Sequence, residues 1–276
     1  MKIAIAGLGL IGGSFAKAIK LKTNHTVAAF DRDEAAVSSA LAEGAIDVAG
    51  IAEFASADIV LIALYPVAAV EFMREVVPQL KPGAIVIDLC GVKRYVIDSA
   101  RELFAARDVT FIGGHPMAGR EVSGFVGSSA TLFDGASMIL TPEADTPDSA
   151  LLLAEEFFLR IGFGRITRTD AATHDEMISF TSQLAHVVSS AYAQNPIALQ
   201  FEGFSAGSFG DMTRVAKLNE DMWTELFLLN SDYLTEQISV ITDNLLEFCR
   251  LIAAGDADGL RELLRKGRII KETLTK

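Results

Sequence analysis

Short apolar runs alternate with helix-like segments along the first 168 residues of the chain. The apolar runs cover residues 2–6, 26–30, 58–64, 84–89, 110–113 and 136–141. Segments of helical composition or period follow them, over residues 14–19, 33–44, 67–80, 92–106 and 148–161. Residues 45–47 fit a short strand or turn, and 114–131 fit a loop. Continuous apolar runs are typical of strands covered on both faces. Their alternation with helices predicts a doubly wound, mostly parallel α/β sheet.

The pattern changes near residue 169. Beyond it no strand run is evident, and helices are expected over residues 174–193, 211–218, 222–254 and 257–271, with a glycine-rich bend at 203–210. Asp170 and Thr173 are suitable N-caps for the first helix. We expect an α/β domain at 1–168 and an all-α domain at 169–276. The apolar helix faces predict burial against a second copy of the chain, and a tucked-in monomeric domain is the alternative.

The amino-acid composition of the chain limits the kinds of molecule that it can bind. The chain has 276 residues, half of them hydrophobic, and a net charge of −12. This charge argues against binding to nucleic acid or to an anionic membrane surface, and no apolar run approaches the length of a membrane span. Cys90 and Cys249 are far apart and show no metal-binding spacing, so we expect free thiols, a cytoplasmic location and no metal site.

The first apolar run leads directly into a glycine motif, Gly7-x-Gly9-x-x-Gly12. A strand, a tight turn and a helix start in this order predict a Rossmann-type dinucleotide-binding domain, although a plain turn without ligand is the alternative. Asp31 follows the second apolar run, nineteen residues after Gly12, and suits the ribose hydroxyls of NAD. The neighbouring Arg32 leaves NADP possible. The cofactor-binding residues expected are Gly7, Gly9, Leu10, Ile11, Gly12, Asp31, Arg32 and Gly91.

A histidine lies at the end of the run over residues 110–113. His115 is flanked by glycines, and Pro116 restricts it to extended backbone geometry. A histidine at a strand end suits general acid–base work near neutral pH, although it could instead satisfy loop backbone groups. Gly91 stands at another strand end, where it would let the nicotinamide ribose approach closely or would simply form a strand–helix corner.

Polar residues also occur in the helical region. Ser182, Gln183 and His186 are three or four positions apart and would form one polar patch on a helix. Arg214 lies in an otherwise apolar turn and needs an anion partner. From spacing alone, that partner is either Asp211 or a substrate carboxylate.

Several motifs occur here in one order: GLGLIGGS, the strand-end Asp31, DLCGVK, GGHPMAGRExSG, HDxxxxxxSQLAH and GDMTRVAxxNEDMW. Together they resemble the prephenate and arogenate dehydrogenase family of tyrosine biosynthesis. The resemblance implies a Rossmann domain joined to a helical dimerisation domain in a homodimer. It also implies an oxidative decarboxylation, in which hydride passes from C4 of the substrate to NAD(P)⁺, the C4 hydroxyl loses its proton, and CO2 leaves as the ring becomes aromatic.

The same resemblance implies roles for individual residues. His115 would hydrogen-bond the C4 hydroxyl as general base, Arg214 would bind a substrate carboxylate, and His186 would contribute to the polar pocket as a second catalytic residue. Two positions differ from the family pattern. Gly91 replaces a serine, whose hydrogen bond a water molecule or Cys90 would have to supply. Gln183 replaces a histidine.

The expected substrate is prephenate, with arogenate as the alternative. Two further alternatives are a β-hydroxyacid dehydrogenase and a non-catalytic NAD(H)-sensing module. The HPMAG segment argues against the first, which would use a lysine base. The second would have no need of His115 together with Arg214.

Overall fold

The computed structural model describes residues 1–105, 107–200 and 202–274, and the chain divides into two compact units. The first unit, Met1–Asn230, contains the sheet and most of the helices. The second, Ser231–Lys276, contains the last two helices. Among the described helices, none is long and apolar enough to cross a bilayer. The domain boundary expected after residue 168 stays a prediction, because the first unit includes helices up to Asn230.

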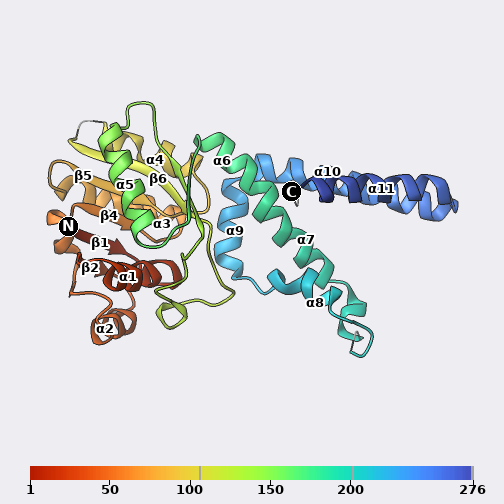
Figure 1. The fold of residues 1–276 in the computed structure, drawn as a ribbon, viewed down its shortest axis with the longest axis horizontal. Coiled ribbons are helices and arrows are strands. Elements are labelled where there is room, and N and C mark those ends of the chain that lie inside the picture. The colour runs from red at the N-terminus through yellow and green to blue at the C-terminus, as the bar shows by residue number, and fades with distance from the viewer. Residues whose placement is uncertain (106, 201, 275–276) are drawn as a thin grey trace. The chain divides into compact units, whose positions relative to one another are not determined.

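The strands of the described residues form one sheet in the order β3-β2-β1-β4-β5-β6-β7-β8 (Figure 1). They are β1 (Lys2–Ala6), β2 (Thr26–Phe30), β3 (Val48–Ala49), β4 (Ile59–Ile62), β5 (Ala84–Asp88), β6 (Val109–Pro116), β7 (Ser137–Thr141) and β8 (Arg165–Arg168). Neighbouring strands are parallel except β6 and β7, which are antiparallel. The order reverses between β1 and β4, so the carboxyl ends of β1, β2, β4, β5 and β6 meet at a topological switch point. Open α/β sheets bind ligands at such a point.

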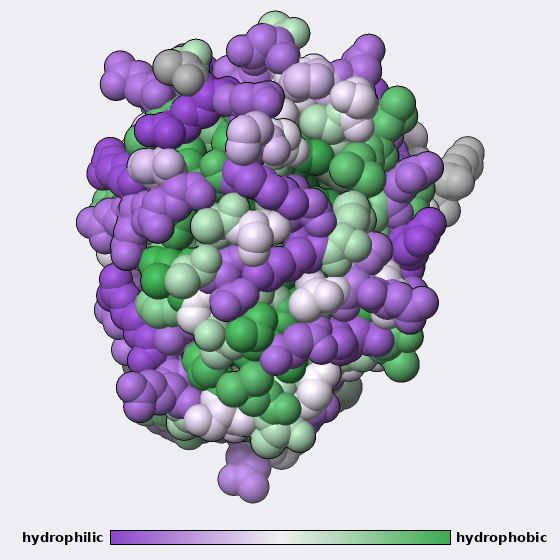
Figure 2. All heavy atoms as spheres, turned by 90° about the vertical axis from the view of Figure 1, so that its left-hand side faces the viewer, coloured by the Kyte–Doolittle hydropathy of each residue, from purple (hydrophilic) through white to green (hydrophobic). Residues whose placement is uncertain are grey.

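Helices cover both faces of this sheet, as the doubly wound prediction requires. One core contains side chains of α1 (Leu10–Lys22), α2 (Glu34–Ala42) and α5 (Asp148–Arg160). The opposite core contains those of α3 (Pro66–Val76) and α4 (Arg94–Phe104). Successive residues of β1 alternate between the two cores, because side chains of a strand point to opposite faces. On the outer face shown in Figure 2, hydrophilic side chains predominate and apolar atoms lie among them in separate patches.

The rest of the first unit is helical. It consists of α6 (Ala171–Ile178), a π-helical turn (Ser179–Gln183), α7 (Leu184–Ala193), a 3₁₀ turn (Pro196–Gln200), α8 (Ser208–Thr213), a 3₁₀ turn (Arg214–Ala216) and α9 (Glu220–Leu229). Asp170 caps α6, since its carboxylate accepts a hydrogen bond from the backbone N–H of Thr173 at 2.9 Å. Thr173 lies inside the helix, so its prediction as a cap was wrong.

The second unit consists of α10 (Ser231–Ala254) and α11 (Ala257–Leu274). Gly259 of α11 lies against the side chain of Leu251, which is buried. Many apolar side chains of these helices are nevertheless exposed in the single chain: Val240, Leu245, Leu246, Ile252, Leu264, Ile269, Ile270 and Leu274. The hairpin therefore buries little of its apolar surface by itself.

The structure differs from the predicted elements in several places. The short strand near residue 45 lies at Val48–Ala49, and β8 was not predicted because its four residues contain a single apolar side chain. The strand expected at 110–113 continues to Pro116, so His115 lies in β6 rather than in a loop. The helix expected over 222–254 is divided at Asn230. The predicted end of the helix over 92–106 falls on residue 106, outside the described residues.

A fully buried ion pair joins the carboxyl end of β5 to β6. Neither the Lys93 nor the Asp88 side chain is exposed, and the Lys93 ammonium pairs with the Asp88 carboxylate. The same ammonium donates to the carbonyl oxygen of Gly114 at 2.6 Å. Asp88 also accepts hydrogen bonds from the N–H groups of Cys90 and Gly114, at 3.1 and 3.3 Å. Charge that is wholly removed from water needs such a full set of partners.

Replacing Lys93 with Met should therefore leave the Asp88 carboxylate buried without its cation. We expect the free energy of unfolding to fall by about 3–5 kcal/mol, measured by urea denaturation followed by circular dichroism. Lys20→Met is the matched control, because the pair of Lys20 with Asp47 is partly exposed. Such a pair contributes less than about 1 kcal/mol. Equal losses in the two variants would show that the buried pair adds no special stability.

Candidate active site

The glycine motif forms a tight turn between β1 and α1. Gly7 has φ +88°, and a Cβ atom there would meet the carbonyl oxygen of Ala63 at 2.4 Å. A Cβ on Gly12 would lie 1.9 Å from the carbonyl oxygen of Gly7. At Gly9, in contrast, a Cβ would meet nothing within 4 Å. Gly7 and Gly12 are therefore required by the turn itself, whereas the space beside Gly9 is open to a ligand.

The start of α1 is suited to phosphate groups. Gly9 is the N-cap and has no side chain to cap the helix. The first intrahelical bond is donated by Gly13 to the carbonyl oxygen of Gly9, and no acceptor among the described residues takes the N–H groups of Leu10, Ile11 and Gly12. Unpaired N–H groups at a helix N-terminus attract anions. These residues fit the pyrophosphate of a dinucleotide.

Asp31 lies at the carboxyl end of β2, beside this turn. One of its carboxylate oxygens accepts the N–H of Leu8 at 2.5 Å, and the other accepts the N–H of Asp33 at 2.8 Å. The side chain is half-buried, and each oxygen has a further lone pair for a ribose hydroxyl. Arg32 is exposed. The placement of Asp31 fits the role predicted for it.

His115 lies near the end of β6, with its ring half-buried. A Cβ on Gly91, just beyond β5, would stand 4.0 Å from Nε2 of His115 and 3.3 Å from Leu226. A serine at this position would therefore place its hydroxyl beside His115. Cys90 does not take over that role, since its buried Sγ lies 3.4 Å from the carbonyl oxygen of Leu64. The suggestion that Cys90 replaces the serine was wrong.

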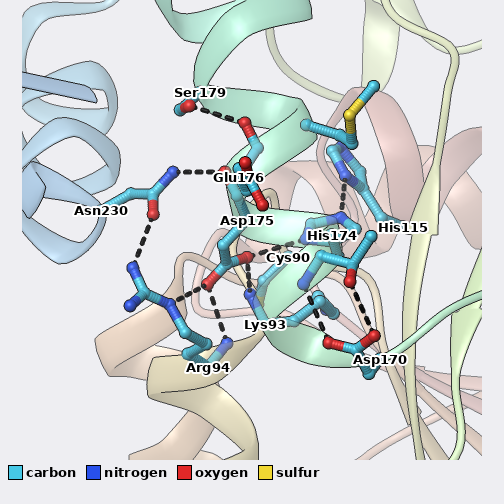
Figure 3. Close-up of polar contacts among 12 residues, drawn as sticks. Cys90, Lys93, Arg94, His115, Asp170, His174, Asp175, Glu176, Ser179 and Asn230 are labelled. Carbon is cyan, nitrogen blue, oxygen red and sulfur yellow. Dashed lines mark hydrogen bonds and ion pairs between the residues drawn. The ribbon is translucent and has the colours of Figure 1, made fainter. Parts of the chain in front are cut away.

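Behind His115 runs a chain of hydrogen bonds (Figure 3). Nδ1 of His115 lies 2.9 Å from Nε2 of His174, and Nδ1 of His174 lies 2.7 Å from Oδ1 of Asp175. The side chains of His174 and Asp175 are fully buried. Asp175 also accepts the N–H groups of Lys93 and Arg94, at 2.7 and 2.9 Å, which ties α6 to the start of α4.

These surroundings determine the charges of the three groups. Burial lowers the pKa of His115 well below its ordinary value of 6.5, and the neighbouring His174 and Lys93 lower it further by disfavouring a second positive charge. Burial also lowers the pKa of His174, although Asp175 opposes the shift. For Asp175, burial alone would raise the pKa, but hydrogen bonds from His174, Arg94 and Lys93 bring it below its ordinary value. At neutral pH both imidazoles are therefore neutral and Asp175 is ionised.

The predicted polar patch of Ser182, Gln183 and His186 forms only in part. The π-helical turn directs Gln183 inward, where its Nε2 donates to the carbonyl oxygen of Leu226 at 3.3 Å. Its Oε1 accepts from Asn230 at 2.8 Å, so both ends of the amide are used inside the protein. Ser182 is half-buried and accepts, through its carbonyl oxygen, a hydrogen bond from Nδ1 of His186 at 2.9 Å.

The ring of His186 stacks on Trp223, with centroids 3.7 Å apart. Its Nδ1 is the donor to Ser182, so Nε2 is left as an acceptor. Burial lowers the pKa of His186, and the charge of Arg214 lowers it further. His186 is therefore neutral at neutral pH and offers a hydrogen-bond acceptor.

Arg214 is exposed, although the residues around it in the sequence are mostly apolar. Its guanidinium pairs with Glu121, which lies in the segment after His115, rather than with Asp211. The pair brings a cation of the helical region close to the residues that follow β6. Within the part of the chain that the structure describes, no three His, Cys, Asp or Glu side chains gather in a way that suits a metal ion.

The motifs found in the sequence contain His174, Asp175, Lys93 and Glu121, but the residue pattern did not indicate which side chains these four contact. The available signal was the His-Asp pair at the start of a helix, beside the cap Asp170. Its meaning depends on His115 and Arg94, which are distant in sequence. Such long-range pairing is visible only in the fold.

Comparisons with known proteins identify the family that the chain resembles. A family model described as prephenate dehydrogenase, nucleotide-binding domain, matches residues 15–167, and one described as prephenate dehydrogenase, dimerization domain, matches residues 170–266. The prephenate dehydrogenase of Lactococcus lactis is 30% identical over 99% of this chain and 77% of its own length. The cyclohexadienyl dehydrogenase of Zymomonas mobilis is 33% identical over 96% of this chain and 93% of its own.

Solved structures are similar as well. The prephenate dehydrogenase of Aquifex aeolicus, in complex with hydroxyphenyl propionate and NAD⁺, has a TM-score of 0.89 and 27% identity, with 99% of this chain and 98% of that chain covered. The arogenate dehydrogenase of Synechocystis has a TM-score of 0.84 and 26% identity, with 99% and 100% covered.

The open space at Gly9 leads to a test of the dinucleotide site. Gly9→Ala should leave the fold unchanged but weaken NADH binding by about tenfold or more, equivalent to about 1.4 kcal/mol, because the new methyl group enters the space beside the pyrophosphate. Fluorescence titration with NADH measures the affinity. Gly12→Ala is the contrasting variant, since its methyl group meets the Gly7 carbonyl and should also lower the thermal unfolding temperature. Unchanged NADH affinity in Gly9→Ala would mean that no dinucleotide lies against this turn.

Proposed function

Because the chain belongs to the prephenate dehydrogenase family, we propose that it oxidises and decarboxylates prephenate with NAD⁺ to give 4-hydroxyphenylpyruvate, a step of tyrosine biosynthesis. The relatives named prephenate dehydrogenase, matched over nearly the whole chain, support this substrate. The bound NAD⁺ in the Aquifex aeolicus structure supports the cofactor. The carboxylate of Asp31 at the ribose position favours NAD over NADP, whose 2′-phosphate it would repel.

One observation carries the proposal: a neutral histidine lies at the same sheet edge as the glycine turn. A dinucleotide bound across the switch point directs its adenosine half towards β2, where Asp31 lies. Its nicotinamide half would then lie towards β5 and β6, and Gly91 and His115 would be the residues beside it. His115 is thus a base beside the expected position of hydride transfer.

His115, the base, accepts one proton during the reaction and later returns it. Bound NAD⁺ supplies the acceptor for the hydride that leaves C4 of the substrate. Nε2 of His115 takes the proton of the C4 hydroxyl as its O–H bond breaks, and the ring becomes aromatic when the bond to the leaving carboxylate breaks and releases CO2. The electrons of that bond remain in the ring and its oxygen, so the protonated His115 returns its proton to the phenolate. Such proton transfer accelerates a reaction by about 10²–10⁴-fold.

The helical region supplies the other binding groups. Arg214 would hold a substrate carboxylate, for which it would exchange its exposed partner Glu121. Ser182 and the acceptor nitrogen of His186 would contact the polar part of the substrate. Since both ends of the Gln183 amide are engaged inside the protein, Gln183 would act by holding the π-helical turn rather than by touching substrate.

The proposal extends to the assembly and its surroundings. The match of residues 170–266 to a dimerization domain and the exposed apolar side chains of α10 and α11 support a homodimer formed through the helical region. The domain division after residue 168 fits the extents of the two matched family models. Both cysteines are free thiols, which supports a reducing compartment such as the cytoplasm.

Measurement of substrate turnover tests the proposed reaction. With NAD⁺ present, the wild-type protein should produce NADH when prephenate is added, and His115→Asn should lower kcat/KM by about 10²–10⁴-fold. Because burial lowers the pKa of His115 well below 6.5, its neutral form predominates above that pH. The kcat/KM of the wild type should therefore be constant from pH 6.5 to neutrality and fall only in more acidic solution.

The same absorbance assay, run with arogenate in place of prephenate, separates the two substrates. Turnover of arogenate alone would make the protein an arogenate dehydrogenase. An absence of turnover with both substrates would exclude the dehydrogenase reaction.

Arg214→Ala tests the carboxylate contact. Loss of a charge-assisted hydrogen bond should raise KM for prephenate by about tenfold or more, with a smaller change in kcat. Arg101→Ala is the control, because Arg101 is a similarly exposed arginine paired with Glu143. A KM increase no larger than that of Arg101→Ala would show that Arg214 does not bind the substrate.

A further inference from the structure

His174 and Asp175 have no part in the reaction as described so far, although they lie directly behind its base. We propose that these two residues are positioning residues that hold the proton of neutral His115 on Nδ1, so that Nε2 is left free to act as the base. The consequence for catalysis rests on the proposed function above. The position of the proton itself does not, and it is measurable without substrate or cofactor.

The carboxylate of Asp175 is surrounded by hydrogen-bond donors. Its Oδ2 faces the backbone N–H of Arg94 at 2.9 Å and Nε of the same arginine at 3.2 Å. Its Oδ1 faces the backbone N–H of Lys93 at 2.7 Å and Nδ1 of His174 at 2.7 Å. Backbone N–H groups and a guanidinium only donate, so this buried carboxylate is ionised and accepts at every contact. The nitrogen of His174 that faces it therefore carries a proton.

A neutral imidazole carries a single ring proton. With its proton on Nδ1, His174 has a bare Nε2, which can only accept. This nitrogen lies 2.9 Å from Nδ1 of His115. His115 must therefore donate from Nδ1, and its own Nε2 is bare. A protonated His174 is disfavoured by burial and by the neighbouring charge of Lys93.

Two neighbours define the direction of the bare Nε2. A Cβ on Gly91 would stand 4.0 Å from this nitrogen and 3.3 Å from the Leu226 side chain, so both groups lie near the position that Gly91 leaves without a side chain. Without the chain of hydrogen bonds, the His115 ring would be free to rotate and to exchange its proton between the two nitrogens. With it, both the orientation of the ring and the accepting nitrogen are determined.

The hydrogen bonds among His115, His174 and Asp175 also stabilise the protonated form of His115. When His115 takes up the substrate proton on Nε2, the positive charge is shared with Nδ1–H. The bare nitrogen of His174 accepts from that group, and its basicity is increased by its own bond to the Asp175 carboxylate. No second proton transfer is required, because the stabilisation is electrostatic, as in other imidazole–carboxylate arrangements.

A purely structural role is the competing explanation, because Asp175 also binds the backbone at the start of α4. The two explanations predict different results when the hydrogen bond between residue 175 and His174 is reversed in direction. In Asp175→Asn, the amide NH2 cannot replace Oδ2, which faces two N–H groups of Arg94. At Oδ1 the NH2 opposes one N–H group, that of the Lys93 backbone, so it takes this place, loses that hydrogen bond and donates to Nδ1 of His174. His174 would then carry its proton on Nε2 and donate to His115, so the proton of His115 would move to Nε2.

The first test is a nitrogen-15 NMR measurement on the intact protein with labelled histidine. The chain has four histidines, and His115→Asn assigns the signals of His115 by their loss. In the wild type at neutral pH, we expect His115 to show a protonated Nδ1 and a bare Nε2. In Asp175→Asn we expect the opposite pattern. A wild-type His115 protonated on Nε2, or an unchanged pattern in Asp175→Asn, would overturn the proposal.

The second test uses two changes at His174. The glutamine of His174→Gln can donate from its amide NH2 to Asp175 and accept from His115 with its carbonyl oxygen. It therefore preserves the direction of both hydrogen bonds. His174→Phe keeps an aromatic ring but removes both hydrogen bonds. In His174→Gln, His115 should keep its proton on Nδ1, and in His174→Phe the Nδ1 and Nε2 signals should show exchange between the two tautomers.

Kinetic measurements then distinguish the positioning role from a purely structural role. We expect KM to be nearly unchanged in all of these variants. We expect kcat to fall by about 100-fold or more in Asp175→Asn, by about tenfold in His174→Phe and by less than that in His174→Gln. A structural role predicts instead that kcat follows the thermal unfolding temperature, with no rescue by glutamine. If no variant, including the wild type, turned over substrate, the function would be wrong, whereas the NMR pattern would still decide the position of the proton.

Discussion

The fully buried ion pair of Lys93 and Asp88 is the constraint on which the site depends. Its two charges have no contact with water, so their partners must be close and complete. The ammonium holds the carbonyl of Gly114, next to His115, and the backbone N–H of Lys93 holds Asp175 of α6. One residue thus joins the end of β5, the strand of the base and the first helix after the sheet. The position of His115 follows from these contacts.

Parts of the site that depend on local sterics could be predicted from the sequence. Gly7 and Gly12 are needed because a Cβ at either position would collide with backbone atoms only a few residues away or on the neighbouring strand end. Asp31 and His115 follow apolar runs that could only be buried strands, so their place at the carboxyl edge followed from topology. The sheet covered by helices on both faces was predicted for the same reason, because each buried strand is a continuous run of apolar residues.

The rest depends on contacts between distant residues. Glu121 and Arg214, or His115 and His174, meet only after the chain has folded, and nothing in their neighbours indicates the pairing. The π-helical turn is a second case. It shifts Gln183 into the interior, away from the patch expected from regular helical spacing. The edge strand β8 was missed because a strand with one apolar residue does not differ in composition from a loop.

The hairpin of α10 and α11 links folding to the amount of protein present. Only Leu234 and Leu251 of these two helices are buried among the described residues, whereas many of their larger apolar side chains are exposed. A segment with so small a core of its own gains most of its stability from whatever covers those side chains. If a second copy supplies that cover, dilution removes it by mass action. The thermal stability of the protein would then vary with its concentration.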